Sequence, residues 1–197
     1  MFRFLVLAFL AVASADIVYD GPCQEVKPVE NFNFSAYQGL WYEVARYPNA
    51  GEEGDKGKCT TAEYTVDGEN GKAKNSHVVD GVKYYIEGDL KLVGPSQVRI
   101  TYTFGGVSKD SYLTILDTDY KSYSIGYSCK YFKETNKHQV FSWIKSRSKI
   151  PEAAAKETVE NYLKDSKILK KSNYVVNDHS DATCGTTIAK RIEKFLD

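Results

Sequence analysis

The stretch Gly39-Leu40-Trp41-Tyr42-Glu43-Val44-Ala45-Arg46-Tyr47 decides the fold, because it is rich in residues that favour β-strands. A glycine opens it, at a point where the backbone has to turn tightly. Pro48 follows and has no amide proton for a sheet ladder, so we expect the strand to end there. The indole of Trp41 suits a strand that enters a barrel and closes its floor. A Gly-x-Trp tripeptide also occurs in unrelated strands, so the rest of the chain has to place it.

Seven further stretches downstream alternate with short turns. Asp67-Gly68 and Asp80-Gly81 fall between alternating runs, and an Asp-Gly pair in that position is a strong hairpin signal. The seven stretches are residues 60–66, 73–79, 82–87, 97–104, 109–116, 121–130 and 137–145. Eight short strands with tight turns are typical of an antiparallel sandwich or an up-and-down barrel.

Period-two alternation assigns the two faces of these strands. Most carry apolar and aromatic side chains on one face and polar ones on the other, which places the first set inside. The stretch over residues 122–130 departs from this pattern, because its outer face carries Tyr123, Ile125 and Tyr127 opposite smaller residues. A helix predicted over residues 151–163, with an apolar stripe at helical spacing, would cover that outer face.

Three other segments carry weaker signals. The loop over residues 48–58 holds three glycines and charges of both signs, which indicates a solvated, mobile loop of the kind that covers a binding mouth. A short strand over residues 173–177 is predicted to return to the sheet edge. The tail over residues 185–197 is predicted to form a weak amphipathic helix through Ile188, Ile192 and Phe195.

The first fifteen residues have the layout of a secretory signal peptide. They combine a charged start, a short apolar run over residues 4–12 and the small residues Ala13-Ser14-Ala15. The run is too short to span a bilayer, and no later stretch is long and apolar enough. We therefore expect a secreted, extracellular, soluble protein that begins near Asp16 and forms one domain over residues 16–197. Lys plus Arg and Asp plus Glu both number 26, and this near-neutral balance argues against nucleic acid or an acidic membrane surface as partner.

Four cysteines follow the signal peptide, at positions 23, 59, 129 and 184. An even number in a secreted chain indicates two disulfides, and three pairings are open. Their wide spacing and the lack of a CxxC pair argue against a metal site, and no free thiol is expected. Asn33-Phe34-Ser35 matches the glycosylation acceptor pattern, whose occupancy the sequence leaves open.

Three short motifs resemble, in their order and separation, the sequence signatures of the lipocalins. They are residues 39–41 (Gly-Leu-Trp), residues 116–120 (Leu-Asp-Thr-Asp-Tyr) and residues 143–148 (Trp-Ile-Lys-Ser-Arg-Ser). A closer resemblance, to the insect bilin-binding proteins and insecticyanins, covers nearly the whole mature chain. It is carried by residues 19–23, 26–29, 41–49, 104–107, 125–127, 129–131 and 159–163. The sequence departs from that group in the glycine-rich loop, over residues 92–97 and in an extended C-terminal tail.

The resemblance implies an all-β fold: an eight-stranded antiparallel up-and-down β-barrel with one C-terminal α-helix packed outside. It also implies a structural role for Gly39, Trp41 and Arg147. The guanidinium of Arg147 would lie across the indole and close the barrel floor, a contact worth roughly 0.5–2 kcal/mol.

The resemblance further implies how the cysteines pair. Cys23 would bridge Cys129, and Cys59 would bridge Cys184. Each bridge would close a loop of more than a hundred residues, which is worth about 4–5 kcal/mol in the chain-entropy model. In both cases an irregular segment is tied to the barrel.

A carrier function follows from the same resemblance: a non-enzymatic carrier of a hydrophobic small molecule, with non-covalently bound biliverdin as the expected pigment. A barrel of this size leaves room for one small ligand, and aromatic walls with a few polar groups suit it. The implied ligand residues are Asn75, His77, Tyr84, Ile86, Tyr102, Phe104, Lys109, Lys130, Gln139, Phe141 and Trp143. The two lysines would meet acidic ligand groups at the mouth, or are ordinary exposed lysines. The interior set, His77 included, is otherwise a filled aromatic core.

Two alternatives remain at this stage. The first is a retinoid, fatty-acid or hormone-like lipid carrier of the same family. The second is a lipocalin enzyme with an unpaired cysteine as nucleophile, but all four cysteines here have natural partners, so we expect no enzyme. Without a free thiol a bilin would be held without a thioether. The oligomeric state is open, a homo-oligomer included.

Overall fold

The structure is a computed structural model that describes residues 16–52, 54, 56–185 and 188–193. The predicted signal peptide over residues 1–15 lies outside the described residues. Among the residues that are described, no helix is long and apolar enough to cross a membrane.

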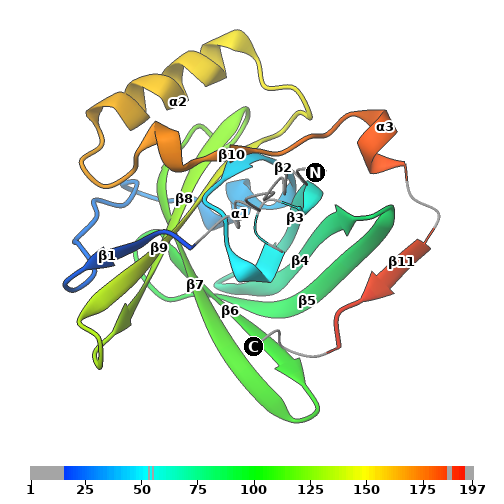
Figure 1. The fold of residues 1–197 in the computed structure, drawn as a ribbon, viewed down its shortest axis with the longest axis horizontal. Helices are drawn as coiled ribbons and strands as arrows, with labels where there is room; N and C mark the ends of the chain where they lie inside the picture. Colours follow the sequence, from blue (N-terminus) through cyan, green and yellow to red (C-terminus); the bar gives the residue numbers. More distant parts are fainter. Residues whose placement is uncertain (1–15, 53, 55, 186–187, 194–197) are drawn as a thin grey trace, which may run out of the picture.

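Eight consecutive strands form a closed antiparallel β-barrel, which confirms the predicted fold (Figure 1). Each pairs with its neighbour in sequence, and β9 also pairs with β2, which closes the barrel. The strands are β2 (Gly39–Arg46), β3 (Lys58–Asp67), β4 (Asn70–Val79), β5 (Val82–Leu92), β6 (Gln97–Phe104), β7 (Val107–Thr118), β8 (Tyr123–Phe132) and β9 (Lys137–Ser146). The turns β4–β5, β6–β7 and β8–β9 lie at the same end of this up-and-down barrel, which we call the rim.

The end opposite the rim is closed by the short helix α1 (Phe34–Tyr37) and by Trp41. The Trp41 indole is fully buried, donates from Nε1 to the Tyr37 carbonyl (2.9 Å) and packs on the Tyr37 ring at 5.0 Å. The guanidinium of Arg147 lies 3.7 Å from the centre of the indole. Gly39 has a φ of +94°, and a Cβ there would stand 3.3 Å from Arg147 Nη1. These three residues therefore form the barrel floor.

One helix, α2 (Ala153–Asp165), packs outside the barrel against β8. Ile125 and Tyr127 of β8 are buried in one cluster with Val159 and Leu163 of the helix. The reversed pattern of β8 in the sequence thus has its cause in this helix. The described residues also form short segments around the barrel: β1 (Val18–Asp20), η1 (Ala50–Glu52), η2 (Lys171–Asn173), β10 (Val175–Val176) and α3 (Asp181–Cys184).

Two disulfides tie irregular segments to the barrel. Cys23 of the N-terminal arm bonds to Cys129 of β8, across 106 positions of sequence. Cys59 of β3 bonds to Cys184 of α3, across 125 positions. These are the two pairs that the family resemblance implies.

The prediction of an amphipathic helix in the tail is wrong. Residues Ile188–Arg191 form a strand, β11, that pairs in parallel with β5 (Figure 1). The spacing of Ile188 and Ile192 suggested helical periodicity, but the backbone finds unpaired hydrogen-bonding groups on β5 and extends along them. Phe195, the third residue of the predicted stripe, lies outside the described residues.

Candidate ligand-binding cavity

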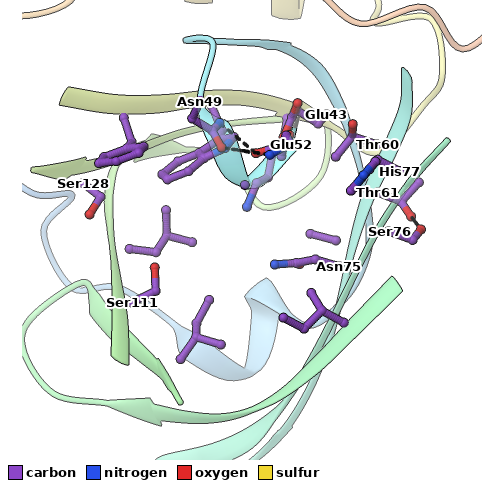
Figure 2. A pocket seen from close by; sticks show the side chains of 18 of the residues that line it. Glu43, Asn49, Glu52, Thr60, Thr61, Asn75, Ser76, His77, Ser111 and Ser128 are labelled. Carbon is purple, nitrogen blue, oxygen red and sulfur yellow. Dashed lines mark hydrogen bonds between the residues drawn. The ribbon is translucent and has the colours of Figure 1, made fainter. Parts of the chain in front are cut away.

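The barrel interior holds a cavity of about 350 Å³ between the floor and the rim (Figure 2). Its volume is within the range of small-molecule sites. The interior is therefore not a filled aromatic core. The cavity wall includes six of the predicted ligand residues: Asn75, His77, Ile86, Tyr102, Phe141 and Trp143.

The other five predicted ligand residues do not line the cavity. Each lies two positions closer to the rim than a cavity-lining residue of the same strand. Residues two apart in a strand share a face, so each of the five lies on the inward face of its strand. The rim residues, each followed by its lining neighbour, are Tyr84 with Ile86, Phe104 with Tyr102, Lys109 with Ser111, Lys130 with Ser128, and Gln139 with Phe141. The predicted set thus divides into a cavity layer and a rim layer.

Aromatic rings form one side of the cavity. The rings of Phe141 and Trp143, both from β9, lie nearly parallel, with centroids 6.2 Å apart and planes at 12°. Tyr102 contributes a ring to another part of the wall, on β6, three strands away from β9, and burial raises the pKa of its hydroxyl, which therefore stays protonated. Flat, nearly parallel rings suit a flat, conjugated ligand.

Asn75 of β4 points into the cavity, as Figure 2 shows. Its Nδ2 donates to the Tyr102 hydroxyl at 3.0 Å. Its Oδ1 is buried and accepts no hydrogen bond from the described residues. A buried acceptor without a donor is unfavourable, and a ligand N–H or O–H would satisfy it. On the same strand His77 is 6% exposed and stacks on Tyr84.

A buried cluster of three charged side chains stands beside the aromatic side. Arg46 is 1% exposed and pairs with Glu43 (Nη1 to Oε1, 3.2 Å) and with Glu52 (Nε to Oε2, 3.3 Å). Burial, followed by the charge of Glu52, raises the pKa of Glu43 well above its usual range. Two carboxyl groups that share one guanidinium cannot both ionise easily in a dry environment. Both Glu43 and Glu52 line the cavity and offer oxygen acceptors.

The glycine-rich loop is attached to this cluster. Arg46 Nη2 donates to the carbonyls of Gly54 (2.7 Å) and Gly57 (3.0 Å). Glu52 Oε1 accepts from Trp143 Nε1 at 2.9 Å, and so connects the loop to the aromatic side of the cavity. The loop lies at the mouth as predicted, but Glu52 is not solvated: it reaches into the barrel.

A lysine also lines the cavity. Lys145 of β9 is 5% exposed and donates from Nζ to the Tyr64 hydroxyl at 2.7 Å. Sequence reasoning missed Lys145 and Glu43, although alternation placed both on inward faces, with Trp143 and Trp41 respectively. Charged residues seldom face inward, and that expectation outweighed the alternation. For Glu52 the sequence carries no signal, because its position depends on the loop.

The described side chains around the cavity form no metal-binding cluster. No group of three or more His, Cys, Asp or Glu side chains with metal-binding geometry is found within residues 16–193 as far as these are described. All four cysteines of the chain form disulfides.

Comparison with known proteins assigns the fold and its relatives. A model of the lipocalin / cytosolic fatty-acid binding protein family matches residues 38–181. The bilin-binding protein of Pieris brassicae is 47% identical over 183 residues, which cover 91% of this chain and 96% of that protein. Insecticyanin-B of Manduca sexta is 42% identical over 194 residues, 93% of each chain.

A solved structure agrees with these sequence relationships. Insecticyanin from the tobacco hornworm Manduca sexta superimposes with a TM-score of 0.85 and 38% identity. The match covers 90% of this chain and 96% of the insecticyanin chain.

Proposed function

This chain belongs to the lipocalin / cytosolic fatty-acid binding protein family, and on that basis we propose that it is a non-enzymatic carrier of biliverdin, bound non-covalently in the barrel. Two relatives that are 47% and 42% identical over more than nine-tenths of the chain are a bilin-binding protein and an insecticyanin. The proposal rests on this kinship together with the chemistry of the cavity.

The observation that carries the choice of ligand is the buried Oδ1 of Asn75, which has no donor among the described residues. Glu43 and Glu52 add further acceptor oxygens to the same cavity. A bilin brings pyrrole and lactam N–H groups, whereas retinol has one hydroxyl and a fatty acid has no N–H group at all. The nearly parallel rings of Phe141 and Trp143 offer a stacking surface for its conjugated rings.

The rim layer gives the acidic side chains of the pigment a place outside the cavity. Lys109 and Lys130 each lie two residues rimward of a lining residue, on adjacent strands β7 and β8. In our proposal they face the two propionates, while Gln139 and His77 supply further hydrogen bonds. Lysine side chains at such a position remain solvated and contribute more to orientation than to affinity.

The cysteines support non-covalent binding. Both disulfides are formed, so no thiol of the chain is left to bond a pigment through a thioether or to act as a nucleophile. The same bridges support a secreted protein, because disulfides persist in oxidising compartments. We propose, in line with the predicted signal peptide, that the mature domain begins near Asp16.

A second candidate ligand is an acidic lipid, such as a fatty acid. Lys145 favours it, because a buried ammonium bonded to the Tyr64 hydroxyl would also attract a carboxylate. Glu43 and Glu52 oppose it, because they line the same cavity with carboxyl oxygens, which would face the carboxylate of the lipid.

The test is a titration of the apo-protein with biliverdin, retinol and palmitate, followed by the fluorescence of Trp143 and by pigment absorption. We expect biliverdin to bind tightest and to gain a sharpened red band. Asn75→Leu should weaken biliverdin by about 1–3 kcal/mol, roughly 5- to 150-fold in Kd, and should weaken retinol, which brings a single hydroxyl and no N–H group, by less. Asn70→Leu, at the exposed start of the same strand, is the matched control and should have no effect. Tighter binding of palmitate or retinol than of biliverdin would overturn the pigment assignment.

A further inference from the structure

The hydrogen-bonded ladder between β5 and β6 is incomplete. These strands pair only where Asp89–Leu92 meets Val98–Thr101. From Gly88 towards the rim β5 has no ladder partner on β6, and Figure 1 shows the β6–β7 hairpin diverging from β5. At Gly88 a Cβ would lie 2.9 Å from the Thr101 carbonyl oxygen, so the strands are in close contact just before they separate. Rimward of this point β5 and β6 share no ladder pairs, which leaves this edge of β5 open to pairing with another strand.

The tail strand β11 occupies that edge of β5. It pairs in parallel from Ile188 opposite Val82 to Arg191 opposite Tyr85. The Ile192 amide then donates to the Tyr85 carbonyl at 2.8 Å. Since β5 begins at the rim, the parallel tail also starts at the rim and runs towards the floor.

The two faces of the tail differ in their surroundings. On the outside, Arg191 Nη2 lies 3.6 Å from Glu87 Oε2 in a half-exposed ion pair. On the inside, Ile192 lines the cavity, as does Ile86 of β5. The tail therefore contributes a side chain to the cavity.

This strand lies outside the part of the chain that defines the family. The family match ends at residue 181, whereas β11 begins at Ile188. The disulfide between Cys59 and Cys184 anchors the chain shortly before β11, on β3 near the rim. This anchor keeps the tail close to β5 and lowers the entropy lost when the two pair.

We propose that β11 is an added side wall of the ligand cavity, and that Ile192 retards the escape of the ligand between the diverging strands β5 and β6. The inference rests on the proposed carrier function and makes the tail a determinant of ligand retention. All four residues of β11 are exposed, and the ion pair between Arg191 and Glu87 is solvated, so the strand is held weakly. Segments of this kind open locally far more often than the whole domain unfolds, so the opening of the tail would limit ligand release.

The test compares the full mature chain with a variant that ends at Gly185 and keeps the Cys59–Cys184 bridge. Dissociation of biliverdin is followed after mixing with an excess of a competing bilin acceptor. We expect the truncated chain to release biliverdin at least tenfold faster. Ile192→Asp should do the same, whereas Ile188→Asp, at a position 51% exposed at the start of β11, should not. Equal release rates for the full and truncated chains, or an equal effect of the two aspartates, would overturn the proposal.

A readout without ligand separates this inference from the proposed function. Trp41 is fully buried, so quenching of tryptophan fluorescence by acrylamide reports mainly on Trp143 in the cavity. Truncation after Gly185 and Ile192→Asp should both raise the quenching constant, and Ile188→Asp should leave it unchanged. If the full chain does not bind biliverdin, the carrier proposal fails, but the side wall is still tested by this quenching. Unchanged quenching in both of the first two variants would exclude the side wall.

Discussion

Replacing Arg147 by methionine tests whether the barrel floor is held as the structure describes. The guanidinium lies 3.7 Å from the centre of the Trp41 indole, a contact worth roughly 0.5–2 kcal/mol. It also donates to the carbonyls of Leu40 (2.8 Å), Gln38 (2.9 Å) and Tyr120 (3.1 Å). These carbonyls regain water when the guanidinium is removed, so we assign about 0.5 kcal/mol to each bond, the low end of the net range.

Together these contacts give an expected loss of about 2–4 kcal/mol in the free energy of unfolding. For a domain of this size that corresponds to a fall of roughly 4–16 °C in Tm. The assay is denaturant and thermal unfolding followed by near-ultraviolet circular dichroism. Arg147→Lys keeps the charge but loses the planar fork, so it should recover only a small part of the loss.

Two controls test whether the effect is specific to Arg147. Arg99→Met removes an arginine whose ion pair with Asp110 spans 3.9 Å on the barrel surface, and should change stability by less than about 1 kcal/mol. The affinity of the folded Arg147→Met protein for its ligand should stay unchanged, because the floor lies apart from the cavity. A loss of stability below about 1 kcal/mol, or full rescue by lysine, would refute the reasoning on Arg147.

Three further predictions concern pH, the second disulfide and the contact between β5 and β6. Burial and Glu52 raise the pKa of Glu43 above 4.5, so above this pH the folded protein keeps a proton that the unfolded chain has released. The free energy of unfolding should therefore fall as pH rises from 4.5 through the folded-state pKa. Glu43→Gln should flatten this fall in unfolding curves from about pH 4 to 9, and identical slopes for the two proteins would contradict the prediction. Replacing Cys59 and Cys184 by serine should lower the free energy of unfolding by about 4–5 kcal/mol in urea, since the bridge spans 125 positions. A loss below about 1 kcal/mol would show that the bridge is not what restricts the unfolded chain. Gly88→Ala should destabilise by about 1–3 kcal/mol through contact with β6, while Gly94→Ala, whose nearest neighbour would be 3.5 Å away, should be nearly neutral.

The barrel was predictable because its information is local. The alternation of apolar and polar residues indicated each of the eight strands. The reversed pattern around Ile125 predicted a helix packed on the outside of the barrel. The inward face also gave six of the residues that line the cavity. The largest error in a strand boundary is in β5, which was predicted to end at Glu87 instead of Leu92, because its lower half carries Gly88 and alternating charges. β4 was also predicted three residues too short, from Ala73 instead of Asn70.

The remaining features depend on contacts that a local pattern does not contain. Ile188 and Ile192 are four apart, which reads as a helix until the open edge of β5 supplies backbone partners. Glu52 enters the cavity because Arg46 draws the loop inward, and no residue near Glu52 indicates that. Glu43 and Lys145 were on the correct face, but the usual exposure of charged residues argued against an inward position.

The most direct test of the carrier proposal is the visible absorption spectrum of the protein purified from its natural source without added ligand. We expect a blue-green protein with a strong red band, and biliverdin in equimolar amount in the denatured extract by mass spectrometry. Because no thiol is free, the pigment should separate completely from the chain on denaturation. A colourless protein whose extract contains a retinoid or a fatty acid would contradict the proposal.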